Sequence, residues 1–217
     1  MKPFVFINAA ISIDGRLTDW RRKQVRISCK EDLIRVDKLR AESDAILVGI
    51  GTVLSDNPSL TVKSNELRKK RISEGKDPNP IRIVLDSKAR TPVNSKILSK
   101  DARTIIAVTN KADENRVAEL KEYAEIVVLG EDKVNLYSLM SFLSKIGVRK
   151  LMVEGGGKVI ASFLKSNLVD KIYTYVGGFV FGEGVSFAEG RVNARFKLAS
   201  VERIGSGVVL EWIPINS

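Results

Sequence analysis

Short apolar runs alternate with amphipathic segments along most of this 217-residue chain, and this alternation constrains its fold more than any other feature. Runs such as Ala45–Ile50 and Thr104–Val108 are almost wholly apolar, which is typical of strands buried on both faces. Between them, Asn135–Ile146 places its apolar side chains on one stripe of a helix. This order of elements predicts an α/β fold with a mostly parallel central sheet and helices on both faces.

The end of the chain carries strand patterns without helices, and Gly205-Ser206-Gly207 predicts a hairpin loop there. We therefore expect a C-terminal antiparallel hairpin. With no internal repeat and no linker of disordered composition, we expect a single domain over residues 1–217. The expected strands are Phe4–Ala10, Ala45–Ile50, Ile81–Leu85, Thr104–Val108, Glu125–Leu129, Lys150–Val153, Lys171–Val176, Phe196–Ile204 and Val208–Pro214. The expected helices are one that follows Ser28 and runs to about Glu42, then Asp113–Tyr123, Asn135–Ile146 and Lys158–Ser166.

Two local signals mark where elements begin and end. Ser28, with Glu31 three residues later, matches the capping box that starts a helix. Gly51–Pro58 is polar and rich in turn formers, so we expect a loop there.

The composition excludes several kinds of chemistry. The chain has no histidine and one cysteine, Cys29, so it has no histidine-based catalysis and no internal disulfide. Zinc would find almost no cysteine or histidine ligands, and we expect no metal site. No apolar run is long enough to cross a bilayer and no signal peptide is evident, so we expect a cytoplasmic protein without membrane contact.

The formal net charge of +10 favours anionic partners, either nucleic acid or phosphorylated small molecules. The cations are scattered and often lie beside acidic residues, and only 6% of residues are aromatic. This pattern is typical of a solvated surface and argues against a nucleic-acid-binding protein, which remains the alternative outside the enzymes.

Four segments carry candidate chemistry. Glycines 155–157 follow a strand and open a helix, which is how backbone amides approach a phosphate. Gly49-Ile50-Gly51 begins like a dinucleotide fingerprint, but Leu54 stands where its third glycine belongs. Asp56-Asn57-Pro58 either supplies a general acid or is a plain turn. Ser87–Arg90, after a strand, either grips a phosphate or is a solvated loop.

Taken in order, several segments resemble the reductases of riboflavin biosynthesis. The similarity is to the stand-alone archaeal and fungal 2,5-diamino-6-(ribosylamino)-4(3H)-pyrimidinone 5′-phosphate reductases and to the reductase half of the bacterial deaminase-reductase. It covers nearly the whole chain. The segments are Asn8–Gly15, Arg26–Ser28, Gly51–Val62, Arg82–Ser87 and Glu154–Gly157.

The resemblance implies a dihydrofolate-reductase-like fold, NADPH as the hydride donor and a homodimer. It implies reduction at C1′ of the opened ribosylamine, giving the ribitylamino product. Asp56 and Glu154 are the implied catalytic residues. The implied cofactor-binding residues are Thr52, Asp56, Ser87, Lys88, Ala89, Arg90, Gly130, Gly155, Gly156, Gly157 and Lys158. The implied substrate-binding residues are Asn8, Ser28, Arg40, Leu60, Lys63 and Glu154, with Arg40 and Lys63 at the substrate phosphate.

Some questions stay open at this point. The substrate is either the diaminopyrimidinone or its deaminated uracil counterpart, and a dihydrofolate-type reductase would share fold and cofactor. Lys63 and Lys158 depart from the arginine and threonine that are common in the family. The zinc deaminase signature of the bifunctional enzymes is absent, since it needs histidine and several cysteines.

Overall fold

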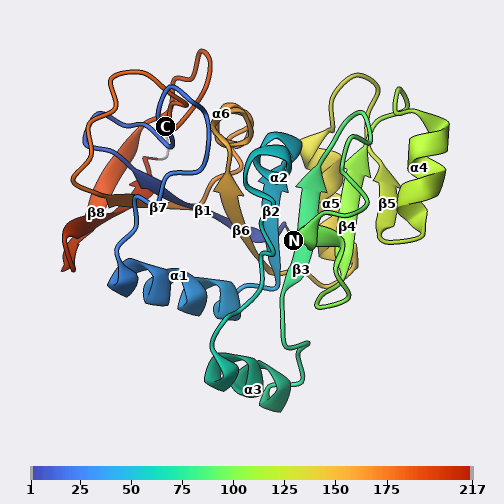
Figure 1. The fold of residues 1–217 in the computed structure, drawn as a ribbon, viewed down its shortest axis with the longest axis horizontal. Helices are drawn as coiled ribbons and strands as arrows, with labels where there is room; N and C mark the ends of the chain where they lie inside the picture. Colours follow the sequence, from blue (N-terminus) through green and yellow to red (C-terminus); the bar gives the residue numbers. More distant parts are fainter. Residues whose placement is uncertain (1, 216–217) are drawn as a thin grey trace. The chain divides into compact units, whose positions relative to one another are not determined.

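The computed structural model describes residues 2–215, which form two compact units (Figure 1). Unit 1 consists mainly of Asp37–Leu151. Unit 2 combines Phe4–Val36 with the residues from Met152 onward. The single domain expected from the sequence stays a prediction, and each unit is described by itself.

Unit 1 contains four parallel strands in the order β5-β4-β3-β2. They are β2 (Ala45–Gly49), β3 (Ile81–Leu85), β4 (Thr104–Val108) and β5 (Glu125–Val128). All residues of β2 and β4 are buried, as their continuous apolar sequences predict.

The helices of unit 1 are α2 (Ile50–Asp56), α3 (Asn65–Ser73), α4 (Glu114–Lys121) and α5 (Leu136–Lys145), with the short 3-10 helix η1 (Lys96–Leu98). Helix α5 buries the stripe predicted from its sequence, and α4 contacts β5. Each of α3, α4 and α5 begins with a side-chain cap, in which Ser64, Asp113 and Asn135 accept a backbone N–H three residues later.

Unit 2 contains β1 (Phe4–Ile11), all but the first two residues of β6 (Lys150–Gly155), β7 (Lys171–Val176), β8 (Phe196–Ile204), β9 (Gly207–Pro214) and α6 (Gly157–Lys165). The strand order is β6-β1-β7-β9-β8. β1 runs parallel to β7, whereas β9 is antiparallel to both β7 and β8. A two-residue turn joins β8 to β9, and its Gly205 has φ +55°. The predicted mostly parallel α/β fold with a C-terminal antiparallel hairpin is confirmed.

Two local expectations were wrong. The segment expected as a loop from Gly51 onward forms α2, because Ile50 and Val53 are buried and Asn57 closes the helix in the left-handed conformation. Helix α1 (Lys30–Glu42) is capped by Cys29 and not by Ser28. The Cys29 carbonyl accepts the first helical hydrogen bond from Leu33 N, and its Sγ accepts from Asp32 N at 3.4 Å.

Candidate functional site

Candidate binding residues of unit 1 follow the carboxyl ends of its parallel strands. Gly49, Leu85, Ala107 and Val127 are successive partners across β2, β3, β4 and β5, so the segments after these strands lie at one edge of the sheet. Those segments hold three predicted cofactor-binding groups, namely Thr52, Ser87–Arg90 and Gly130. Ligands in open α/β sheets bind at this edge.

The loop after β3 is held rigidly from inside the unit. Asp86 is fully buried, and its Oδ2 accepts hydrogen bonds from Thr91 N at 2.7 Å and Thr91 Oγ1 at 2.8 Å. Ala89 is also fully buried and has φ +53°, a conformation that residues other than glycine adopt only where the surroundings impose it. The backbone carbonyl of Ser87, two residues after the end of β3, accepts a hydrogen bond from Thr109 Oγ1 at 2.8 Å.

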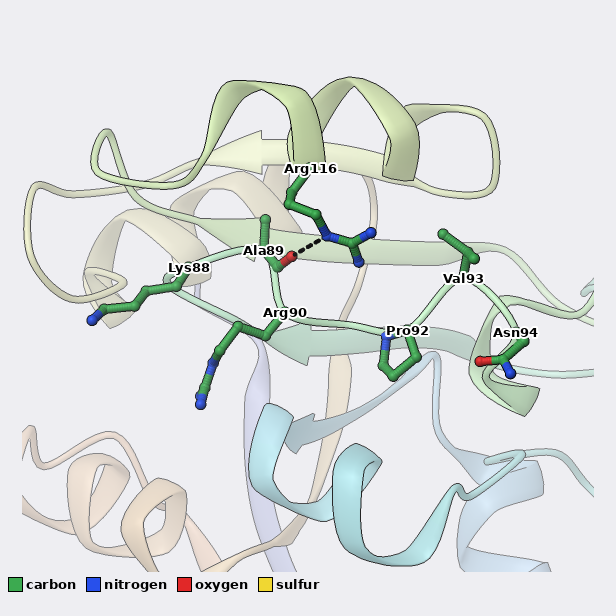
Figure 2. A pocket seen from close by; sticks show the side chains of 7 residues that line it. All are labelled: Lys88, Ala89, Arg90, Pro92, Val93, Asn94 and Arg116. Carbon is green, nitrogen blue, oxygen red and sulfur yellow. Dashed lines mark hydrogen bonds between the residues drawn. The ribbon is translucent and has the colours of Figure 1, made fainter.

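Arg116 of α4 holds the same loop from outside. Its Nη2 donates to Thr91 O at 2.7 Å and its Nε donates to Ala89 O at 3.3 Å. Lys88 and Arg90 extend from the loop, and Arg116 reaches it from the helix (Figure 2). These three cations, with Ala89 and Pro92–Asn94, line a pocket of about 710 Å³. The pocket is therefore suited to an anionic group.

Glycine at position 130 has a local structural reason. Gly130 has φ +106°, and a Cβ there would lie 2.4 Å from Lys133 O. Its carbonyl accepts from Asn110 N at 3.0 Å. The turn after β5 thus requires glycine whether or not a ligand binds.

Asp56 is the last residue of α2 and is partly buried. Its Oδ1 is buried and has no hydrogen-bond partner within residues 2–215. Burial raises the pKa of this carboxyl above its ordinary value, while a hydrogen bond from the Ser55 side chain opposes the shift. A carboxyl that holds its proton more tightly than usual is suited to general acid chemistry.

Arg40 and Lys63 lie close together in unit 1. Lys63 Nζ donates to Ser59 Oγ at 2.7 Å and Thr61 Oγ1 at 2.8 Å, and Arg40 Nη1 lies 3.5 Å from Thr61 O. Burial, and next the charge of Arg40, lower the pKa of Lys63. Leu60 has φ +47° and is only 2% exposed, so the structure leaves little of this predicted substrate-binding residue open to a ligand. The arrangement brings two cations together, as a phosphate site requires.

Arg82 of β3 supports the segment that contains Leu60 and Lys63. This role of Arg82 was not predicted from the sequence. Its fully buried guanidinium donates to Ala102 O at 2.6 Å, Thr104 Oγ1 at 3.0 Å and Ser99 Oγ at 3.1 Å. It also contacts Ser59 O at 3.4 Å, next to Leu60. Burial lowers its pKa from the ordinary arginine value. A charged residue in an otherwise apolar strand was the signal that could have revealed it.

In unit 2, Glu154 lies near the end of β6, and the glycine segment leads into α6. The Gly155–Gly156 peptide bond is cis, and Gly155 has φ +112°. Gly156 stands at the N-cap of α6 and offers no side-chain hydrogen bond, while Val159 N donates to Gly156 O at 2.9 Å. The start of a helix is where main-chain amides can bind a phosphate. Gly157 is required by packing, because a Cβ there would lie 2.3 Å from Ser186 O. The Lys158 side chain is exposed.

Asn8 and Ser28 belong to a buried polar cluster in unit 2. Arg35 Nη2 donates to Asn8 Oδ1 at 2.8 Å, and Arg35 Nε donates to Asp32 Oδ1 at 2.8 Å. Ser28 Oγ donates to the other Asp32 oxygen at 2.5 Å. The predicted substrate ligand Ser28 is thus engaged with its own neighbour. Asp32 and Arg35 are further residues that sequence reasoning missed.

Comparison with solved structures defines the class of fold. A pyrimidine reductase-like protein of Corynebacterium diphtheriae superposes with a TM-score of 0.88 at 19% identity, covering 99% of this chain and 93% of that chain. Dihydrofolate reductase of Enterococcus faecalis, solved in complex with NADP(H), gives a TM-score of 0.56 at 11% identity over 98% and 97% of the two chains. The protein therefore has the dihydrofolate-reductase-like fold predicted from the resemblance.

Sequence comparison then gives the family. The RibD C-terminal domain family matches residues 3–210, and the chain belongs to this family. The 2,5-diamino-6-ribosylamino-4(3H)-pyrimidinone 5′-phosphate reductase of Archaeoglobus fulgidus is 51% identical over 95% of this chain and 96% of its own. The resemblance identified from the motifs is confirmed. Within residues 2–215, no helix is both long and apolar enough to cross a membrane.

Proposed function

We propose that this protein reduces the ribosyl side chain of 2,5-diamino-6-(ribosylamino)-4(3H)-pyrimidinone 5′-phosphate to the ribitylamino product, using NADPH. The observation that carries the proposal is the 51% identity to the Archaeoglobus reductase over almost the full length of both chains. Each unit also holds candidate groups of the kinds that this reaction needs, cations for phosphates and carboxyls for proton transfer.

The loop pocket of unit 1 supports a nicotinamide cofactor that carries an extra phosphate. Lys88, Arg90 and Arg116 line a space large enough for a phosphorylated ribose, and arginine can bind phosphate through two nitrogens. We assign Ser87–Arg90, Thr52 and Gly130 to this cofactor in unit 1. In unit 2 we assign it Gly155–Lys158, where main-chain amides at the start of α6 are suited to phosphate oxygens.

Arg40 and Lys63 are proposed to bind the 5′-phosphate of the substrate. This phosphate is remote from the reacting carbon, so binding it orients the sugar without competing with the chemistry. The lowered pKa of Lys63 fits this role, because an added dianion would offset the repulsion from Arg40. Leu60, Ser28, Asn8 and Glu154 are proposed to contact the rest of the substrate.

Asp56 is proposed as the proton donor, with Glu154 as the second catalytic carboxyl. When bound, NADPH supplies the hydride that reduces C1′ of the opened imine. Burial raises the pKa of Asp56, so a larger fraction of the carboxyl is protonated at a given pH than for an exposed aspartate. Asp56 would give its proton to the ring oxygen of ribose as the bond between C1′ and that oxygen breaks. This leaves C1′ in a protonated imine, so addition of one hydride gives the neutral ribitylamino product.

A homodimer is proposed for the assembled enzyme. β8 is the last strand of unit 2, and it exposes Leu198 and Val201, at 48% and 59%. An exposed apolar edge strand is a surface that a second copy can cover. Light scattering during size-exclusion chromatography should report twice the mass of the chain, and a monomeric mass would contradict the proposal.

The test of function is NADPH oxidation with three substrates compared in parallel: the diaminopyrimidinone ribosyl phosphate, its deaminated uracil counterpart and dihydrofolate. We expect turnover of the first and none of dihydrofolate. Preferred turnover of the uracil compound would assign the other order of reduction and deamination. NADPH binding without turnover of either ribosyl phosphate would contradict the proposed substrate. Repeating the assay with NADH tests the cofactor choice.

A further inference from the structure

Four side chains of unit 2 form a continuous hydrogen-bonded chain that ends at Asn8. Ser28 donates to Asp32, Asp32 accepts from Arg35, and Arg35 donates to Asn8. Asp32 is completely buried. Asn8 lies on β1 and is only 6% exposed. Both Asp32 oxygens are engaged, so the carboxylate holds the guanidinium in one place.

Tyr173 restrains the guanidinium further. It is the direct partner of Asn8 across the parallel β1–β7 pair, so the two side chains share one face of the sheet. The central carbon of the Arg35 guanidinium lies 5.8 Å from the centre of the Tyr173 ring. Arg35 is therefore held by an ion pair and by an aromatic face.

The consequence for Asn8 concerns the direction of its carboxamide. Arginine has only donors, so Arg35 Nη2 demands that Asn8 turn its oxygen toward it. The Asn8 Nδ2 group must then point the other way, as a donor. No other hydrogen bond is made by the Asn8 side chain within residues 2–215. Arg35 Nη1 is also buried without a partner in that range.

Buried donors without partners cost folding free energy, so each one in a native protein calls for an explanation, such as a bound ligand that supplies the acceptor. A network built only to join α1 to β1 would satisfy its own donors. Here Arg35 Nη1 is buried without a partner within residues 2–215, and Asn8 Nδ2 makes no hydrogen bond in that range.

We propose that Arg35 is a positioning residue that sets the Asn8 carboxamide as a hydrogen-bond donor to an acceptor atom of the ribosylamino-pyrimidine. The inference rests on the proposed function. It goes beyond that function because it states that Asn8 donates the hydrogen bond and that Arg35 imposes this direction. Asp32 and Ser28 act through Arg35.

The decisive variant is Asn8→Asp. The carboxylate has the same shape and still accepts from Arg35, but burying a second carboxylate near Asp32 costs folding free energy, so we expect a modest fall in melting temperature. It has no donor to offer, so we expect KM for the pyrimidine substrate to rise about tenfold or more, with KM for NADPH within twofold. Asn167→Asp, which makes the same change at an exposed position of unit 2, should match the wild type.

Arg35→Met and Arg35→Lys test the positioning step. Methionine lets the carboxamide turn over, so we expect a smaller rise in pyrimidine KM, on the order of threefold to tenfold. Lysine still donates to the Asn8 oxygen and should recover part of that loss. If Arg35→Met fails to fold, Asn8→Asp still decides the question.

The outcomes separate this inference from the proposed function. An active wild type whose Asn8→Asp variant keeps its pyrimidine KM would overturn the inference and leave the function standing. A fall in stability with unchanged KM would show a purely structural network and would also overturn it. A wild type inactive on every ribosyl phosphate would overturn both.

Discussion

The two units hold their candidate groups in different ways. In unit 1 the groups lie on segments that follow the carboxyl ends of parallel strands, as Ser87–Arg90 does after β3. In unit 2, Asn8 lies inside β1, and its orientation depends on side chains that α1 brings to the sheet. Residues on loops can be substituted with little effect on the core. A residue inside a strand packs against its neighbours, so its substitution also affects that packing.

This contrast predicts different responses to substitution. Changes at the strand ends of unit 1 should alter chemistry or ligand affinity and leave folding intact. Changes beneath them, at buried side chains that support the loops, should alter folding. The following substitutions test that separation, beginning with the largest expected effect.

Asp56→Asn should lower kcat about a hundredfold or more, because the amide cannot supply a proton. Burial raises the pKa of Asp56, so ionisation costs the folded state stability, and that cost grows as pH rises through the folded-state pKa. The amide removes the cost, so the variant should be at least as stable in mildly alkaline buffer and gain nothing in acid. Steady-state kinetics and melting curves at both pH values check this. Full kcat in the variant would remove Asp56 from the mechanism.

Arg82→Met should destabilise unit 1 by about 3 kcal/mol or more, since several buried carbonyls lose their donor. Arg103→Met is the matched control, because Arg103 directly precedes β4, the strand that pairs with β3. Arg103 is exposed and donates to Glu125 at 2.6 Å, so its loss should cost at most about 1 kcal/mol. Urea unfolding measures both. If the two substitutions lowered the free energy of unfolding equally, the distinction between exposed groups at the strand ends and buried side chains that support them would be contradicted.

Lys63→Met should raise KM for the phosphorylated substrate by about tenfold to a hundredfold, with little change in kcat, because it removes one of the two charges proposed to bind the phosphate. KM for NADPH should not move. Lys69→Met, an exposed lysine of α3, controls for the loss of charge. If KM rose equally in the control, the cause would be the lower net charge of the protein and not the loss of a phosphate site.

Cys29→Ser should change stability least, by about 0.5 kcal/mol in the stabilising direction, because a serine oxygen caps a helix better than a thiol. Cys29→Ala should lose about 1 kcal/mol. Thermal unfolding of the two variants measures the difference. Identical melting temperatures would show that the sulfur does not cap α1.

Much of the fold could be predicted from the sequence because buried parallel strands leave continuous apolar runs. Phe4–Ala10 and Ile81–Leu85 are recovered almost to the residue. Helix α2 could not be predicted, since its sequence contains glycine and turn formers and its helicity comes from burying Ile50 and Val53. The start of α1 was misassigned because serine is the commoner cap, whereas here Cys29 takes that position.

The candidate site divides in the same way. Loop groups such as Asp56 and Arg90 stand in recognisable motifs, so the sequence could propose them as candidates. Arg35, Arg82 and Arg116 were not proposed, because each acts on backbone or side-chain atoms distant in sequence. A charge pattern along one chain does not show whether an arginine is solvated or buried until the fold brings its acceptors to it.

The division of unit 2 into two sequence segments bears on how the chain is made. β1 and its partner β7 are separated in the sequence by almost all of unit 1, so β7 is synthesised only after that unit. The parallel sheet of unit 1 lies in one continuous stretch and can form during translation. Closing so long a loop delays β1, which must wait as an unpaired apolar strand. The sheet of unit 2, with Asn8 in it, is therefore completed only after unit 1 has been synthesised.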